Sequence, residues 1–164
     1  LVSNSNLITI TGGKWTTYRQ MAEDTIDLAI KTKKMQFKPC QTRHLKIHGY
    51  KENPDRSNWM YVYGSDQDEI LRLQKENPAY KEKLHTDFDF TVAEVVWAVR
   101  HEMARTIDDV LARRVRALYL DAKASVTMAP KVAAIMAEEL GLDQQWIDMQ
   151  IKTFNDIADN YIIR

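Results

Sequence analysis

The stretch TVAEVVWAVRHEMARTIDDVLARRVRALYL, residues 91–120, carries the clearest helical pattern of the sequence. Thr91 and Glu94 form a capping box, and Thr106 with Asp109 repeats the start signal for a second helix. Apolar residues follow each start at the spacing of one helix face, which predicts two amphipathic helices packed through these faces. The two faces consist of Val92, Val95, Val96, Val99 and Met103, and of Ile107, Val110, Leu111, Val115 and Leu118.

The helical pattern continues upstream of this stretch. Ser65 and Asp68 begin a helix that should stop before Pro78, because the residue before a proline is biased away from the helical conformation. The aromatic run WMYVY, residues 59–63, predicts a short helix packed on the others. The alternative for this run is an exposed aromatic patch for a membrane or a subunit.

Two more helices are predicted downstream. The first follows Asp121 and ends at Gly141, and Pro130 should either kink this helix or restart it. Asp143 should cap the last helix. Several amphipathic helices with short loops predict a mainly α fold, with a helical bundle over residues 54–164. Three methionines lie at core-like positions of these helices: Met128, Met136 and Met149.

The composition excludes several classes of protein. Lys plus Arg and Asp plus Glu number 23 each, so the formal net charge of zero favours no nucleic-acid partner. A single cysteine, Cys40, fits a reducing compartment. No apolar run approaches the roughly 20 residues of a membrane span, and the N-terminus lacks a signal peptide and an initiator Met. We therefore expect residue 1 to lie inside a longer protein, with a trimmed or processed chain as the alternative.

A second distinctive stretch, NLITITGGKWTTYRQMAEDTIDLAI, covers residues 6–30. Residues 7–10 predict a strand whose ladder partner should lie upstream, and a helix is predicted from Thr16 onward. The glycines between them allow positive φ, so that helix amides and Lys14 can approach a negatively charged group. The spacing does not match a phosphate-binding P-loop. The stretch therefore predicts another kind of anion site, with a plain turn and a solvated Lys14 as the alternative.

Two blocks of the sequence resemble FAD-dependent glycerol-3-phosphate dehydrogenases. ITITGGKWTTYRQMAEDT, residues 8–25, resembles the segment near the end of their flavin domain. DFDFTVAEVVWAVRHEMARTIDDVLARRVRALYL, residues 87–120, resembles the opening of their helical C-terminal domain. The resemblance implies oxidation of glycerol 3-phosphate to dihydroxyacetone phosphate by hydride transfer to FAD, with a quinone as the acceptor of the electrons.

The same resemblance implies which residues form the site. It places Gly12 and Gly13 against the flavin, and Lys14, Thr16 and Thr17 at the polar edge of the ring or at the substrate. Lys14 is the candidate catalytic residue. The dinucleotide fingerprint GxGxxG is absent from this sequence, so the part that grips FAD should lie upstream. We therefore expect this chain alone to be inactive and to bind FAD weakly.

The predicted organisation has three parts. Residues 1–34 should be the last strand and helix of an FAD-binding α/β domain, residues 35–53 a connector, and residues 54–164 the helical C-terminal domain. No calcium-binding EF-hand loop is present, which favours a bacterial-type enzyme. The resemblance further implies a cytoplasmic protein, peripheral on the inner face of the cell membrane, with a homodimer left open. The alternative is a helical interaction or dimerisation module without a catalytic role.

Two other groups of residues have a spacing or charge that could form a site. Cys40, His44 and His48 have a metal-like spacing, but a strand over residues 44–48 would separate the two histidines by about 13 Å. We therefore predict no metal site. The second group should form ion pairs with nearby acids, with a phosphate site or docking against the flavin domain as alternatives. This group consists of Arg100, His101, Arg105, Arg113, Arg114 and Arg116.

Overall fold

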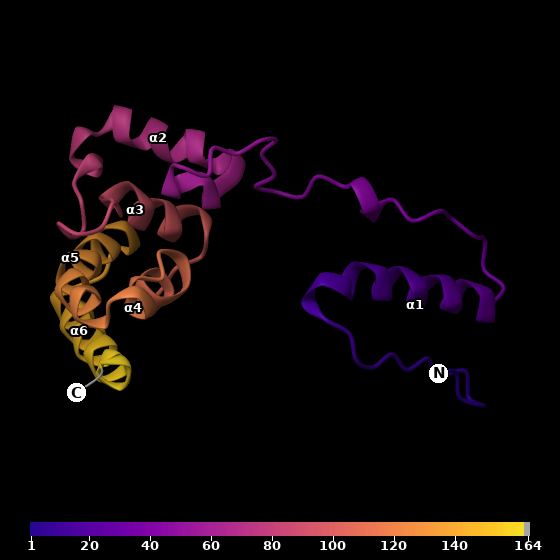
Figure 1. Cartoon of the computed structure of the whole chain (residues 1–164). Coiled ribbons are helices and arrows are strands. Elements are labelled where there is room, and N and C mark those ends of the chain that lie inside the picture. Colours follow the sequence, from indigo (N-terminus) through magenta and orange to yellow (C-terminus); the bar gives the residue numbers. More distant parts are fainter. Residues whose placement is uncertain (163–164) are drawn as a thin grey trace. The chain divides into compact units, whose positions relative to one another are not determined.

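The structure is a computed structural model and describes residues 1–162 of the chain. It consists of two compact units, Leu1–Tyr50 and Lys51–Arg164. The division falls inside residues 35–53, the predicted connector. Both units are helical, which confirms the mainly α fold (Figure 1).

The first unit contains one long helix. α1 (Tyr18–Thr32) follows directly on a 3₁₀ turn, η1 (Trp15–Thr17), and a second 3₁₀ turn, η2, spans Thr42–His44. The predicted strand at residues 7–10 is wrong, because only an isolated bridge between Val2 and Ile8 forms there. The strand suggested at residues 44–48 is also wrong, because η2 ends at residue 44, residues 45–47 have no regular structure and a turn begins at residue 48.

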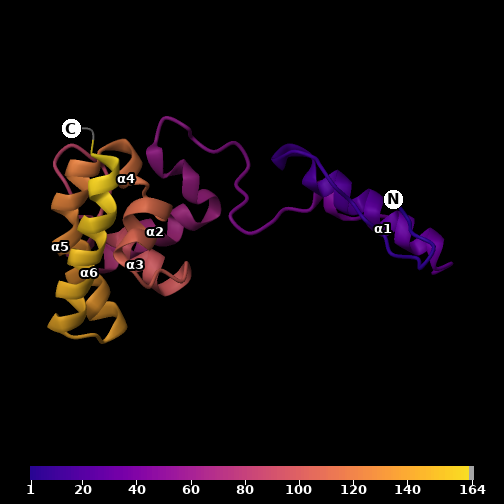
Figure 2. The ribbon, with the colours of Figure 1, turned by 90° about the horizontal axis from the view of Figure 1, so that it is seen from below.

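The second unit is a helical bundle. Its longest helices are α5 and α6, which lie side by side in both views (Figures 1 and 2). α3 packs against α5, and α2 packs against α3. The elements are η3 (Trp59–Asp66), α2 (Gln67–Glu76), η4 (Pro78–Lys81), α3 (Val92–His101), η5 (Asp109–Arg114), α4 (Ala117–Leu120), α5 (Ala122–Leu140), α6 (Gln144–Ala158) and η6 (Asp159–Tyr161).

Local signals fix the ends of the α5–α6 hairpin as predicted. Asp121 Oδ1 accepts a 2.9 Å hydrogen bond from the amide of Ala124 at the start of α5. Gly141 ends α5 in the left-handed conformation, with φ 67°. Asp143 Oδ1 accepts a 3.0 Å hydrogen bond from the amide of Trp146 in the first turn of α6. α5 runs through Pro130 without the restart that the sequence left open.

The core of the second unit lies between α3, η5, α5 and α6. Val95, Leu111, Met128 and Phe154 are among its buried side chains, and each comes from a different one of these elements. Burying large apolar side chains supplies the main stabilising free energy of such a bundle. A smaller cluster links η3 and α2 to the other side of α3 and consists of Met60, Tyr63, Ile70, Ala93 and Trp97.

The second helix of the opening stretch is less regular than predicted. Its segment forms a π-helix, η5, and then a separate turn of α-helix, α4, with Arg116 in the left-handed conformation (φ 58°) between them. Val115 and Leu118 are nevertheless buried, so the prediction of an apolar face is confirmed. Met103 was wrongly assigned to the face of the first helix, because α3 ends at His101 and Met103 is 78% exposed.

Candidate functional site

The turn before α1 is built on two glycines with positive φ. Gly12 has φ 79° and Gly13 has φ 102°, values that side chains with a Cβ adopt rarely. Lys14 then returns to an extended conformation, and η1 begins at the next residue. The chain thus brings bare backbone to the start of a helix, as the sequence predicted.

The two glycines differ in their surroundings. A Cβ atom added at Gly13 would lie 2.1 Å from Sδ of Met21, so the flexible end of that side chain would have to move. A Cβ atom added at Gly12 would meet nothing within 4 Å. Gly13 therefore serves the packing of the turn on α1, whereas Gly12 leaves open space beside its backbone.

Thr17 closes the turn through hydrogen bonds to Lys14. Its hydroxyl accepts from the Lys14 amide at 2.9 Å and donates to the Lys14 carbonyl at 3.0 Å. The amide of Thr17 also donates to that carbonyl, at 2.9 Å. Thr17 thus holds the backbone that carries Lys14.

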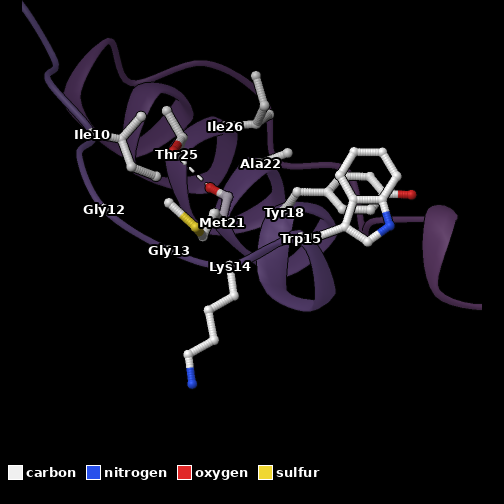
Figure 3. Close-up of a pocket in the computed structure, with 10 residues that line it drawn as sticks. All are labelled: Ile10, Gly12, Gly13, Lys14, Trp15, Tyr18, Met21, Ala22, Thr25 and Ile26. Carbon is white, nitrogen blue, oxygen red and sulfur yellow. Dashed lines mark hydrogen bonds between the residues drawn. The ribbon is translucent and has the colours of Figure 1, made fainter. Parts of the chain in front are cut away.

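A cavity of about 610 Å³ lies along this turn and the first turns of α1 (Figure 3). Of the predicted site residues it brings together Gly12, Gly13 and Lys14, whereas Thr16 and Thr17 do not line it. The sequence did not indicate that the other lining side chains belong to a site. These are Ile10, Trp15, Tyr18, Met21, Ala22, Thr25 and Ile26.

Two aromatic rings form one end of the cavity. The ring centroids of Trp15 and Tyr18 lie 5.2 Å apart and are tilted by 34°. Trp15 is 86% exposed, which is unusual for a tryptophan in a packed protein. The i, i+4 spacing of Tyr18, Ala22 and Ile26 is a signal in the sequence that could have indicated this wall.

The electrostatics of the turn favour a negatively charged group. Neither η1 nor the first turn of α1, all of which the structure describes, contains an acidic residue. The Lys14 side chain extends away from the other residues of the cavity (Figure 3). In the next turn, Glu23 pairs with Arg19 at 2.5 Å. The amides at the start of the helix and the Lys14 ammonium therefore keep a local positive potential.

The first unit has no core of its own. None of residues 1–50, all of which the structure describes, is buried. Ile10, Trp15 and Ile26 are each at least 48% exposed. A helix with one apolar side normally covers that side against another element. Within the first unit, nothing buries the apolar side of α1, which adjoins the glycine turn.

Cys40 takes part in a small polar cluster beside α1. Its Sγ lies 3.0 Å from Oγ1 of Thr42, and Arg19 Nη1 lies 3.2 Å from the same oxygen. Within residues 1–162, no three His, Cys, Asp or Glu side chains are grouped so that they could hold a metal ion. Among these residues there is also no helix with the length and hydrophobicity to cross a bilayer.

Three of the five arginines in the second group form ion pairs within the described residues, as predicted: Arg100, Arg113 and Arg114. Arg100 donates two hydrogen bonds, of 2.6 and 2.7 Å, to the carboxylate of Glu139. Arg113 pairs with Asp108. Arg105 and Arg114 donate to backbone carbonyl groups. These contacts tie α3 to α5 and hold the irregular segment between α3 and α4.

Comparison with known proteins places the chain in a family. The family described as the C-terminal domain of alpha-glycerophosphate oxidase matches residues 7–147. The chain is 35% identical to the mitochondrial glycerol-3-phosphate dehydrogenase of Mesocricetus auratus, covering 85% of this chain and 22% of that protein. It is 33% identical to the Homo sapiens protein of the same name, covering 93% of this chain and 24% of that protein.

A similar match extends to fungi. The mitochondrial glycerol-3-phosphate dehydrogenase of Schizosaccharomyces pombe is 33% identical, over 89% of this chain and 29% of that protein. The chain thus spans between a fifth and a third of the length of these relatives. No solved structure matches the chain. The match of residues 7–147 includes both the glycine turn and most of the bundle, and the chain belongs to the family of C-terminal domains of alpha-glycerophosphate oxidase.

Proposed function

We propose that this chain is the C-terminal part of an FAD-dependent glycerol-3-phosphate dehydrogenase, and that its glycine turn forms part of the flavin site. The names of the relatives support the reaction, because they are glycerol-3-phosphate dehydrogenases. The observation that carries the proposal is the turn of Gly12, Gly13 and Lys14 at the start of α1, with no carboxylate in the first helical turn.

The turn fits a flavin ring for physical reasons. The open space beside Gly12 allows a planar group to approach the backbone closely. Bound FAD would accept the hydride from the substrate, and its ring becomes more negative in doing so. The positive end of α1 and Lys14 would then stabilise the reduced state more than the oxidised state. Lys14, Thr16 and Thr17 would meet the polar edge of the ring or the oxygens of the substrate. Thr17 also fixes the turn through its hydrogen bond with the Lys14 amide.

The uncovered side of α1 supports a place in a larger domain. Residues 1–34 would be the last piece of the FAD-binding domain, which would cover Ile10, Trp15 and Ile26 in the longer protein. Residues 35–53 would connect this piece to the helical domain of residues 54–164. The chain by itself would be inactive and would bind FAD weakly, because the fingerprint for the pyrophosphate is absent from it.

The remaining features of the proposal rest on the resemblance of the sequence to this class of dehydrogenase. The substrate would be glycerol 3-phosphate, and the electrons would pass from the flavin to a quinone. The protein would act at the inner, cytoplasmic face of a cell membrane as a peripheral protein of the bacterial type, and a homodimer is one arrangement of its subunits.

The test uses the longer protein that contains this chain. The purified protein should be yellow, and glycerol 3-phosphate added without oxygen should bleach the visible flavin bands. A colourless protein that takes up no FAD would contradict the proposal. The glycine turn would then be a structural feature only, and the bundle would be a helical interaction module.

A further inference from the structure

A groove in the helical unit is separate from the glycine turn. One cavity of about 520 Å³ is lined by residues of η3, α4 and the segment around Phe90. A second cavity of about 400 Å³ adjoins it at the end of η5. The two cavities share Val62, Arg114 and Arg116, so they form neighbouring parts of one groove. Each part has the volume of a small-molecule site.

The first part of the groove is aromatic and apolar. Trp59, which is half-buried, and Phe90, which is buried, line it with ring centroids 5.0 Å apart in an edge-to-face arrangement. Tyr119 and Leu120, at its rim, are 58% and 66% exposed. The rings of Trp59 and Phe90 are fixed by packing. Tyr119 is largely exposed, and its ring meets that of Tyr161 edge to face with the centroids 5.5 Å apart. This part therefore suits a flat apolar group that stacks on an aromatic ring.

The second part of the groove is basic, with Arg113, Arg114 and Arg116 in its lining. Arg113 is paired with Asp108. Arg114 donates to the carbonyl of Asp109 and lies 3.7 Å from the carboxylate of Glu102, which also lines this part. The charges of these two arginines are thus balanced by neighbouring acids.

Arg116 is the exception among these arginines. Within the described residues no carboxylate forms an ion pair with it, although it is exposed and lines both parts of the groove. Its left-handed backbone, with φ 58°, is uncommon for a residue with a long side chain. Backbone conformations of this kind cost free energy and cluster at ligand sites. The π-helix that precedes it, η5, is a second irregularity often found at such sites.

From the charge and shape of the groove we infer that it binds a planar aromatic anion, whose ring stacks on Tyr119 and whose negative group pairs with Arg116. A nucleoside monophosphate is the simplest ligand of this class, because it joins a flat base to a phosphate. Guanidinium groups bind phosphate through two parallel hydrogen bonds. This inference does not depend on the flavin chemistry of the longer protein.

The experiment compares three probes on the intact 164-residue chain by isothermal titration: adenosine 5′-monophosphate, adenosine and inorganic phosphate. The monophosphate should bind about tenfold or more tightly than either of its parts, since it alone occupies both parts of the groove. Equal binding of the monophosphate and inorganic phosphate, or no binding of the monophosphate, would overturn the inference.

Variants locate the binding. Arg116→Asn removes the charge but keeps a residue type that tolerates positive φ, and it should reduce the affinity for the monophosphate to that for adenosine. Should the asparagine variant fail to fold, Arg116→Gly gives the same comparison. Tyr119→Ala should lose the part of the affinity for the monophosphate that comes from stacking of its base, whereas Tyr119→Phe should retain this part.

Two further variants serve as controls. Lys152→Gln removes one exposed positive charge from α6 and should leave the affinity unchanged. Lys14→Gln tests whether the probe binds at the glycine turn instead. Loss of binding in Lys14→Gln together with full binding in Arg116→Asn would overturn the inference.

Discussion

The hydroxyl of Tyr63 donates a 3.0 Å hydrogen bond to Oε1 of Glu94 and so joins η3 to α3 inside the bundle. Glu94 also accepts from the amide of Thr91 at 2.8 Å and from its hydroxyl at 3.0 Å. Its side chain is buried, with only 1% of the residue exposed, and within the described residues no Lys or Arg forms an ion pair with it. The carboxylate therefore depends on three neutral donors.

Burial raises the pKa of Glu94 to about 8, from 4.5. Because the folded state binds this proton more tightly than the unfolded state, Glu94 contributes most to stability below pH 4.5. This contribution falls as the pH rises through 8. The loss amounts to a few kcal/mol at most. Urea unfolding at pH 6 and pH 9 should therefore give a lower free energy of unfolding at pH 9.

The variant Glu94→Gln isolates this effect. A glutamine amide can accept from Thr91 and donate to Tyr63, and it does not ionise. The variant should lose less free energy of unfolding than the wild type between the two pH values. An identical pH dependence in both proteins would show that Glu94 does not titrate in this range.

Tyr63→Phe should remove one of the three donors of Glu94 and lower the free energy of unfolding by about 1–2 kcal/mol. The loss should be larger at pH 9, where Glu94 is ionised and needs its donors most. Tyr61→Phe is a matched control, because Tyr61 is 40% exposed. Equal losses from the two substitutions would contradict a special role for the hydrogen bond between Tyr63 and Glu94.

Phe154→Ala should destabilise the helical unit strongly, because Phe154 on α6 is 1% exposed and belongs to the main core. Removing a buried phenylalanine costs about 3–5 kcal/mol. Met149→Ala on the same helix removes a side chain that is 53% exposed, and it should change the free energy of unfolding by less than about 0.5 kcal/mol. Thermal and urea unfolding measure both changes.

Gly13→Ala should reduce the flavin content of the longer protein more than Gly12→Ala. Both positions have positive φ, but the φ of 102° at Gly13 lies further from the left-handed region than the 79° at Gly12, so alanine is more strained at position 13. An added Cβ there would also push the flexible end of the Met21 side chain aside, and relief of the strain would move the backbone that carries Lys14. The absorbance ratio of flavin to protein after purification is the measurement. Equal flavin content in the two variants would show that the geometry of the turn at Gly13 does not determine flavin binding.

Local sequence signals predicted the best-formed parts of the fold. The caps Asp121 and Asp143, Gly141 and the pairing of Thr91 with Glu94 all depend on a few neighbouring residues, and the structure confirms each of them. Such signals can be read from a sequence because the groups that satisfy the helix ends lie within one turn.

Features that depend on distant contacts were predicted less well. The strand at residues 7–10 was wrong, because β-branched residues favour a strand only where a partner strand lies beside them. Met149 fits the period of α6 but lies at the edge of its apolar face, and it is 53% exposed. The left-handed Arg116 interrupts a pattern that the sequence continues unbroken, and nothing in the local residue types predicts this break.

Some residues of the candidate site were predicted from the sequence, and others were missed. Gly12, Gly13 and Lys14 were predicted because two glycines and a lysine at the start of a helix have a direct physical meaning. Trp15, Tyr18 and Met21 were missed as lining residues, because apolar residues at helical spacing normally indicate a core. The assignment of Lys14, Thr16 and Thr17 to flavin or substrate stays a prediction.

The most direct test of the proposed function is the rate at which glycerol 3-phosphate reduces the flavin of the longer protein in a single turnover. We predict that Lys14→Gln slows this step about 100-fold or more, because the variant loses a positive charge where negative charge develops. Lys33→Gln, an exposed change at the other end of α1, should leave the rate unchanged. A rate for Lys14→Gln equal to that of the wild type would contradict a role for the glycine turn in the reaction.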